Sequence, residues 1–187
     1  NNSLTQSAAA CDGADSDCTY NWAIPDTVPT GSNKMKVKVT WNGDAGNVSD
    51  ASTNNFTIKA KLQITQPIAS AQWLAQDNGT INWTKNGTWT PNTANLYYQI
   101  GGGAWNSIAT VNASNLTYTW ANISTGAISA NNTRIIIEST ADTSVNNASA
   151  YFTVYPYIEV TYPNTPLTWN VTENRQITWN ITGTMDK

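Results

Sequence analysis

The chain contains no histidine, and only 11% of its 187 residues are charged. Without an imidazole, Ser-His-Asp triads, imidazole general bases and nearly all zinc sites are excluded. Nine Lys and Arg against twelve Asp and Glu give a net charge of −3, so the sequence has no basic footprint for nucleic acid. No run approaches the ~20 apolar residues of a membrane span. We therefore expect neither a nucleic-acid partner nor a membrane span in this chain.

Amide and hydroxyl side chains are abundant where charged ones are scarce. The chain has 25 Asn, 28 Thr and 14 Ser, which together make up more than a third of the residues. Nine Trp and eight Tyr supply apolar surface for a packed core, whereas disordered chains lack such aromatic content. This composition indicates an extracellular or cell-surface β-protein with a polar but weakly charged surface.

An internal repeat is present at an offset of 96 residues. Residues 62–89 read LQITQPIASAQWLAQDNGTINWTKNGTW, and residues 158–185 read IEVTYPNTPLTWNVTENRQITWNITGTM. Trp73 matches Trp169 (169 − 73 = 96), and the two stretches align without a gap. The repeat predicts that both stretches form the same part of one structural unit.

A second set of matches links the front of the chain to its middle. Residues 20–23 (YNWA) match residues 118–121 (YTWA) at an offset of 98, and residues 56–58 match residues 152–154 at an offset of 96. The unit is therefore about 96 residues long.

Three domains follow from this repeat. We expect residues 1–61 to form the C-terminal part of a unit, residues 62–157 to form a complete one, and residues 158–187 to form the N-terminal strands of a further one. The two end fragments together correspond to nearly one whole unit.

The local pattern within the unit is that of strands. Leu62 and Ile64, like Ile158 and Val160, alternate with polar residues at a period of two. No window of helical length carries an apolar stripe at a period of 3.6 residues. About seven short strands in 96 residues are typical of an immunoglobulin-like sandwich. The predicted fold is all-β, with tandem Ig-like or fibronectin-III-like β-sandwiches.

The same residues resemble a known family. The front of the unit (Pro163, Trp169, then Ile177-Thr178-Trp179), the Tyr-x-Trp-x-x-Pro of residues 20–25 and the Phe-Thr-Ile of residues 56–58 are similar to the Ser-Thr-rich, GPI-anchored-type Ig-like domain. This resemblance implies tandem β-sandwiches of microbial cell-surface and secreted proteins, used as spacers or stalks without activity of their own.

Asn-x-Ser/Thr sequons are about twice as frequent as chance pairing predicts, because 25 × 42/187 gives about six. The thirteen candidates for N-glycosylation are Asn1, Asn47, Asn55, Asn78, Asn82, Asn86, Asn112, Asn115, Asn122, Asn131, Asn147, Asn170 and Asn180. The middle residue is often large and apolar, as in Asn82-Trp83-Thr84 and Asn115-Leu116-Thr117. On a strand such a residue points inward while the flanking Asn and Thr face solvent. We expect covalent glycans, preferentially at Asn122, Asn170 and Asn180; accidental sequons in Asn- and Thr-rich strands are the alternative.

Two cysteines, Cys11 and Cys18, enclose a short polar stretch. In an exported protein such a pair is expected to close a small disulfide loop, and two free thiols are the alternative. The stretch also contains Asp12, Asp15 and Asp17, but their spacing does not match a calcium-binding EF-hand loop. We expect no metal ion and no cofactor.

The tryptophans and carboxylates suggest no enzyme. The nearest sequence neighbours of Glu138, Glu159 and Glu173 include no catalytic partner, and glycoside hydrolysis needs two acids that face each other. Three tryptophans have partners at equivalent repeat positions, and all six residues are expected in cores: Trp22 with Trp120, Trp73 with Trp169, and Trp83 with Trp179. A sugar-stacking surface could only use the tryptophans without such partners, Trp41, Trp89 and Trp105.

Three functions are compatible with these features. The first is a non-enzymatic structural subunit of a glycosylated extracellular filament, in which residues 158–187 of one copy complete residues 1–61 of the next, head to tail. The side chains expected to make this contact are Ile158, Val160, Trp169, Ile177, Trp179 and Ile181. The second function is a stalk segment of a longer tandem-repeat surface adhesin. The third is a carbohydrate-binding module.

Overall fold

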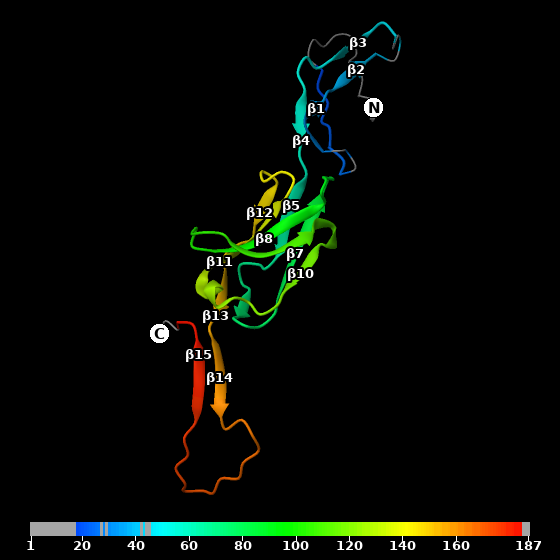
Figure 1. Cartoon of the computed structure of the whole chain (residues 1–187). Coiled ribbons are helices and arrows are strands. Elements are labelled where there is room, and N and C mark those ends of the chain that lie inside the picture. Colours follow the sequence, from blue (N-terminus) through cyan, green and yellow to red (C-terminus); the bar gives the residue numbers. More distant parts are fainter. Residues whose placement is uncertain (1–17, 27, 29, 42, 44–45, 185–187) are drawn as a thin grey trace. The chain divides into compact units, whose positions relative to one another are not determined.

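A computed structural model describes residues 18–184 of the chain, except residues 27, 29, 42 and 44–45 (Figure 1). The chain divides into two units, Asn1–Ala60 with Asn86–Thr88, and Lys61–Lys85 with Trp89–Lys187. The described residues contain fifteen β-strands and two short 3-10 helices, η1 (Ala113–Asn115) and η2 (Thr125–Ala127), and no α-helix. The predicted all-β class is confirmed.

The second unit contains a sandwich whose first sheet has three strands. These are β5 (Lys61–Gln66), β7 (Gly79–Asn86) and β10 (Thr117–Trp120), in the order β10-β7-β5. Their apolar residues alternate with polar ones, so Leu62, Ile64, Ile81 and Trp83 are buried on one face. The alternation seen in the sequence is therefore the alternation of the sheet's two faces.

The opposite sheet follows the order β6-β13-β11-β8-β9, with β12 paired to β11. Its strands are β6 (Gln72–Leu74), β8 (Thr93–Ile100), β9 (Asn106–Asn112), β11 (Ser129–Ser139), β12 (Asn146–Ala148) and β13 (Phe152–Tyr155). The pairing of β6 with β13 is parallel, and the other pairings in this sheet are antiparallel. Gly101 and Gly102, in the turn between β8 and β9, have positive φ angles of 55° and 77°, which glycine adopts without steric cost.

This topology is that of an Ig-like, fibronectin-III-like β-sandwich. In the usual lettering, β5, β7 and β10 are strands A, B and E, while β13, β11, β8 and β9 are strands G, F, C and C′. The chain leaves the first sheet after strand A, and β6 then pairs in parallel with strand G. Nine strands are present instead of about seven, because β6 and β12, of three residues each, have no alternation long enough to predict.

Aromatic rings fill one end of the core. Trp73 contacts Phe152 edge to face, with ring centroids 4.7 Å apart, and lies 6.4 Å from Trp120, on which Tyr98 stacks at 5.2 Å. Trp83 and Trp120 are buried as predicted, whereas Trp73 is half-buried. Such aromatic pairs stabilise a core beyond the area that they bury.

Outside this sandwich, the described strands form three separate pairs. In the first unit, β1 (Gly31–Met35) pairs with β4 (Phe56–Ile58), and β2 (Lys38–Thr40) pairs with β3 (Ser49–Ala51). In the second unit, β14 (Tyr157–Tyr162) and β15 (Thr178–Thr182) form an antiparallel pair that shares no sheet with the sandwich strands (Figure 1). The strands of the sandwich run from Lys61 to Tyr155. The domain boundaries expected from the sequence, at residues 61/62 and 157/158, stay predictions.

Candidate assembly surfaces

The strand pair β2–β3 in the first unit repeats the pair β11–β12 of the sandwich. Val39 lies opposite Asp50 in the first pair, as Ile137 lies opposite Asn147 in the second. The offsets are 98 for the first strand (137 − 39) and 97 for the second (147 − 50). The two pairs also have the same number of paired residues, so they are equivalent pieces of the same fold.

The hydrogen bonds beside these strands recur as well. The N–H of Ser52 donates to the carbonyl of Val37 at 2.8 Å, and the N–H of Ser149 donates to the carbonyl of Ile135 at 2.8 Å. In return, the hydroxyl of Ser52 accepts the N–H of Val37 at 3.3 Å, and that of Ser149 accepts the N–H of Ile135 at 3.0 Å. The first unit therefore reproduces the local geometry of strand F and its partner.

The strand pairs β2–β3 and β11–β12 differ in whether another sheet covers them. Ile135 and Ile137 are fully buried, and β11 lies against β5 of the opposite sheet. Val37 and Val39 occupy the equivalent positions but are 46% and 71% exposed. The described strands of the first unit, β1 to β4, include no counterpart of β5 or β7. Among its described residues, the first unit thus contains one half of a sandwich core without the strands that would cover it.

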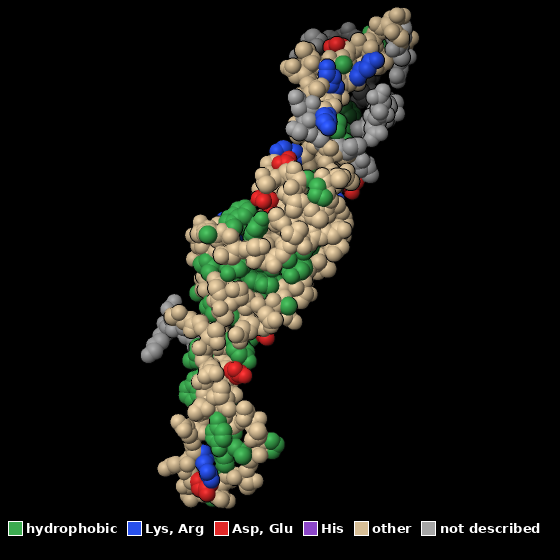
Figure 2. Space-filling model, in the orientation of Figure 1, with side chains coloured by type: hydrophobic (Ala, Val, Ile, Leu, Met, Phe, Trp, Pro, Cys, Tyr) green, Lys and Arg blue, Asp and Glu red, His purple; other side chains and the backbone are tan. Residues whose placement is uncertain are grey.

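The pair β14–β15 presents the complementary half. Ile158 lies opposite Ile181, and Val160 lies opposite Trp179. Directly opposed residues of an antiparallel pair share a face, so these four apolar side chains form one surface. Figure 2 shows apolar side chains over the segment that carries these strands.

Exposure separates these residues from their equivalents in the sandwich. The six residues that the sequence marks for assembly are 37–55% exposed: Ile158, Val160, Trp169, Ile177, Trp179 and Ile181. Four of their equivalents, 96 positions earlier, are at most 9% exposed: Leu62, Ile64, Ile81 and Trp83. Ile177 lies just before β15, which begins at Thr178. The predicted core role of Trp169 and Trp179 is therefore not fulfilled within the described chain.

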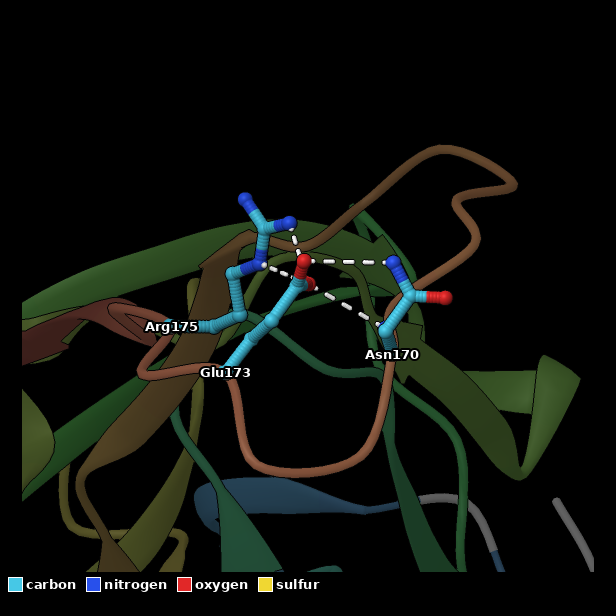
Figure 3. A network of polar contacts seen from close by, with 3 residues as sticks. All are labelled: Asn170, Glu173 and Arg175. Carbon is cyan, nitrogen blue, oxygen red and sulfur yellow. Dashed lines mark hydrogen bonds and ion pairs between the residues drawn. The ribbon is translucent and has the colours of Figure 1, made fainter.

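A polar network holds part of the connection between β14 and β15 (Figure 3). The carboxylate of Glu173 accepts hydrogen bonds from the backbone N–H and the side-chain amide of Asn170, both at 3.1 Å, and from Nε of Arg175 at 3.1 Å. Arg175 also forms an ion pair with Glu173. The bond from Arg175, followed by those from Asn170, lowers the pKa of Glu173 below its usual value. Glu173 therefore contacts a cation and an amide, as expected for a structural carboxylate.

Most of the predicted glycosylation sites that the structure describes are accessible. Ten of the twelve described sequon asparagines are exposed, and Asn82 and Asn147 are half-buried; Asn1 lies outside the described residues. The expected strand geometry holds at Trp83, which is buried between Asn82 and an exposed Thr84.

At several other sequons, the expectation of a strand with a buried middle residue is wrong. Leu116 and Val171, the middle residues of two of them, are exposed and lie outside strands. Leu116 has a positive φ of 62° at the end of η1. Asn122 and Asn170 are exposed, but they too lie in loops and not on outward strand faces. Turn geometry, which the alternation does not encode, places these residues.

Of the two cysteines predicted to form a disulfide, the structure describes only Cys18. Cys18 is disulfide-bonded, while Cys11 lies outside the described residues, as do Asp12, Asp15 and Asp17. The pairing of Cys18 with Cys11 stays a prediction. Within the described part of the chain, no three His, Cys, Asp or Glu side chains gather where they could hold a metal ion. None of the described helices has the length and hydropathy of a membrane span.

The tryptophans without repeat partners do not share one environment. Trp41 and Trp105 are exposed, and Trp105 lies 5.5 Å from Tyr97. Trp89 is half-buried, donates from Nε1 to the carbonyl of Thr93 at 3.2 Å, and lies under the ammonium of Lys85 at 4.5 Å. Of the acids considered for catalysis, Glu138 lies on β11 and Glu159 on β14.

Comparisons with known proteins find similarity in structure alone. No family model matches the chain, and no curated protein is similar to it in sequence. Fibronectin(III)-like modules of Clostridium thermocellum CbhA match with a TM-score of 0.32 and 13% identity, over 50% of this chain and 94% of that one. A marsupial T cell receptor matches with a TM-score of 0.33 and 12% identity, over 55% of this chain and 59% of the receptor chain.

Proposed function

We propose that the chain is a non-enzymatic structural subunit of an extracellular filament. In this proposal, β14 and β15 of one copy complete the half-sandwich that β1 to β4 form in the next copy. One observation carries it: the two apolar faces that pack against each other in the core of the sandwich each recur once more in the chain. One recurs in β2–β3 and the other in β14–β15, and both are exposed.

The energetics favour such a contact. Fully burying a Val, Ile or Leu side chain stabilises by about 1.5–3 kcal/mol relative to leaving it in water. Val37 and Val39 on one copy, and Ile158, Val160 and Trp179 on the other, would all be buried together. The contact would join two different surfaces of the subunit, so it propagates into a filament unless the rotation between copies closes a ring.

Other features fit an extracellular setting. The disulfide at Cys18 is the kind of bond that persists in oxidising compartments. Exposed sequon asparagines offer attachment points for glycans, and the resemblance to Ser-Thr-rich, GPI-anchored-type domains implies a cell-surface protein. Glycans would shield strand faces that have few charges to prevent unspecific association.

A stalk segment of a longer adhesin is the second candidate. In that case, further residues of the same polypeptide would cover the exposed surfaces, and no contact between copies would be needed. A carbohydrate-binding module has weaker support, because the ring pair of exposed Trp105 and half-buried Tyr97 is the only one described outside β14–β15 and its connection that includes an exposed ring.

Deletion of residues 158–187 tests the filament. We expect the full chain to form fibres in electron micrographs and to sediment as a polymer, and the truncated chain to be monomeric. Near-ultraviolet circular dichroism of the truncated chain shows whether the sandwich is still folded. Fibres of the truncated chain would contradict strand donation, and a monomeric full chain would favour the stalk.

A further inference from the structure

Inside the sandwich, a side chain of one sheet accepts a hydrogen bond from the backbone of the other sheet. The N–H of Ile64, on β5, donates to Oδ1 of Asn147, on β12, at 2.8 Å. β5 is the edge strand of its sheet, so an N–H that points away from β7 has no neighbouring strand to accept it. Asn147 supplies the acceptor in a part-buried position, where an unpaired N–H would be costly.

Both partners of this hydrogen bond have equivalents in the two exposed surfaces. Asp50 lies opposite Val39 as Asn147 lies opposite Ile137, so Asp50 takes the place of Asn147. Val160 takes the place of Ile64, since 160 − 64 is the repeat offset of 96. Asp50 is exposed, whereas Asn147 is half-buried. The acceptor position is thus occupied in the half-sandwich by a carboxylate instead of an amide.

We infer that Asp50 of one copy accepts a hydrogen bond from the backbone N–H of Val160 in the next copy. This inference rests on the filament proposed above and names the polar contact at its junction. A carboxylate oxygen accepts as an amide oxygen does, and the resulting charge-assisted bond is shorter and stronger than a neutral one. The carboxylate therefore strengthens the bond at the one place where the two sheets belong to different molecules.

The contact also specifies the register of the donated strand. A shift of one residue would turn Ile158 and Val160 from the core face to the solvent face. Because the N–H groups of neighbouring strand residues point to opposite sides, the same shift would remove the N–H of Val160 from Asp50. The apolar surface and the carboxylate thus select the same register.

Hydrogen–deuterium exchange of assembled full-length chains tests this contact. The variants are Asp50→Ala, which removes the acceptor, and Asp50→Asn, which keeps an acceptor oxygen, with Asn147→Ala as the matched control in the sandwich. All proteins are made in a host that does not glycosylate, since Asp50→Asn creates a sequon with Ser52. Exchange is measured by mass spectrometry on peptides that cover residues 158–162 and 62–66.

We expect Asp50→Ala to exchange about tenfold to a hundredfold faster over residues 158–162, as the loss of a hydrogen bond to a charged group implies, and Asp50→Asn to stay within a few-fold of the wild type. Asn147→Ala should accelerate exchange over residues 62–66 alone.

Several results would overturn the inference. Wild-type fibres with unchanged exchange over residues 158–162 in Asp50→Ala would refute the contact and leave the filament in place. Equal loss of protection in Asp50→Ala and Asp50→Asn would show that acceptance by this side chain is not the cause. A wild-type chain that stays monomeric would overturn both the contact and the filament. If Asp50→Ala fails to assemble, assembly of Asp50→Asn supports the contact, and failure of both variants contradicts it.

Discussion

Val39 and Ile137 occupy the same position in two copies of one strand pair, yet Ile137 is fully buried and Val39 is 71% exposed. The two strand pairs have the same register, but β11 lies against β5 of the opposite sheet, and the described strands of the first unit include no counterpart of β5. Burying an exposed apolar residue such as Val39 would stabilise the protein. An apolar surface of a second molecule, or of a further segment of the chain, would provide that burial.

Replacement of Trp83 by Ala should destabilise the sandwich by about 3–5 kcal/mol, because a large cavity would remain in the core. Trp83 is 2% exposed, and its Nε1 donates to the carbonyl of Ala113 at 2.8 Å. Urea unfolding followed by circular dichroism measures the effect.

Trp179→Ala, at the equivalent position of β15, is the matched control. It should change the unfolding free energy of the sandwich by less than about 0.5 kcal/mol, since its side chain is 55% exposed. It should weaken fibres instead. An unchanged midpoint for Trp83→Ala would contradict the core assignment.

Ser149→Ala should cost about 1–3 kcal/mol of unfolding free energy, because it leaves a buried N–H without an acceptor. The hydroxyl of Ser149 accepts the N–H of Ile135 at 3.0 Å and donates to the carbonyl of Ala150 at 2.7 Å. Thermal unfolding checks this value. Ser52→Ala removes the equivalent, exposed bond at 3.3 Å and should have a smaller effect; an equal loss in both variants would be unexpected.

Cys11 and Cys18 should be joined by a disulfide, which non-reducing mass spectrometry would detect as a mass lower by two hydrogens. The closed loop spans eight residues (18 − 11 + 1), so its contribution should not exceed the ~3 kcal/mol of a 15-residue loop. Reaction of both cysteines with a thiol reagent in the denatured, unreduced protein would disprove the pairing.

The intact mass of the native protein should exceed the 20.3 kDa of the polypeptide, because exposed sequons such as Asn122, Asn170 and Asn180 are expected to carry glycans. Asn147 should be unmodified: its Oδ1 accepts the N–H of Ile64, and the hydroxyl residue of its sequon, Ser149, is buried. Glycopeptide mass spectrometry assigns the sites. A native mass of 20.3 kDa would refute glycosylation.

Much of the fold was predictable because the determining signals are local. The alternation at Leu62 and Ile64 predicted a strand with one buried face, and the matched tryptophans predicted Trp83 as a core residue; both are buried. β6 and β12 were not predictable, because three residues carry no measurable period. The inward orientation expected of Leu116 was wrong, because a left-handed turn at this residue points its side chain to solvent.

The repeat in the sequence determined which positions are equivalent, and hence that Val160 corresponds to Ile64 and Val39 to Ile137. Only the tertiary structure decided which of these equivalent residues are buried. A strand's pattern specifies its apolar face through the local geometry of the backbone, whereas burial requires a second sheet from elsewhere in the chain or from another molecule. The contact between Ile64 and Asn147, 83 residues apart, likewise became visible only when the two sheets were brought together.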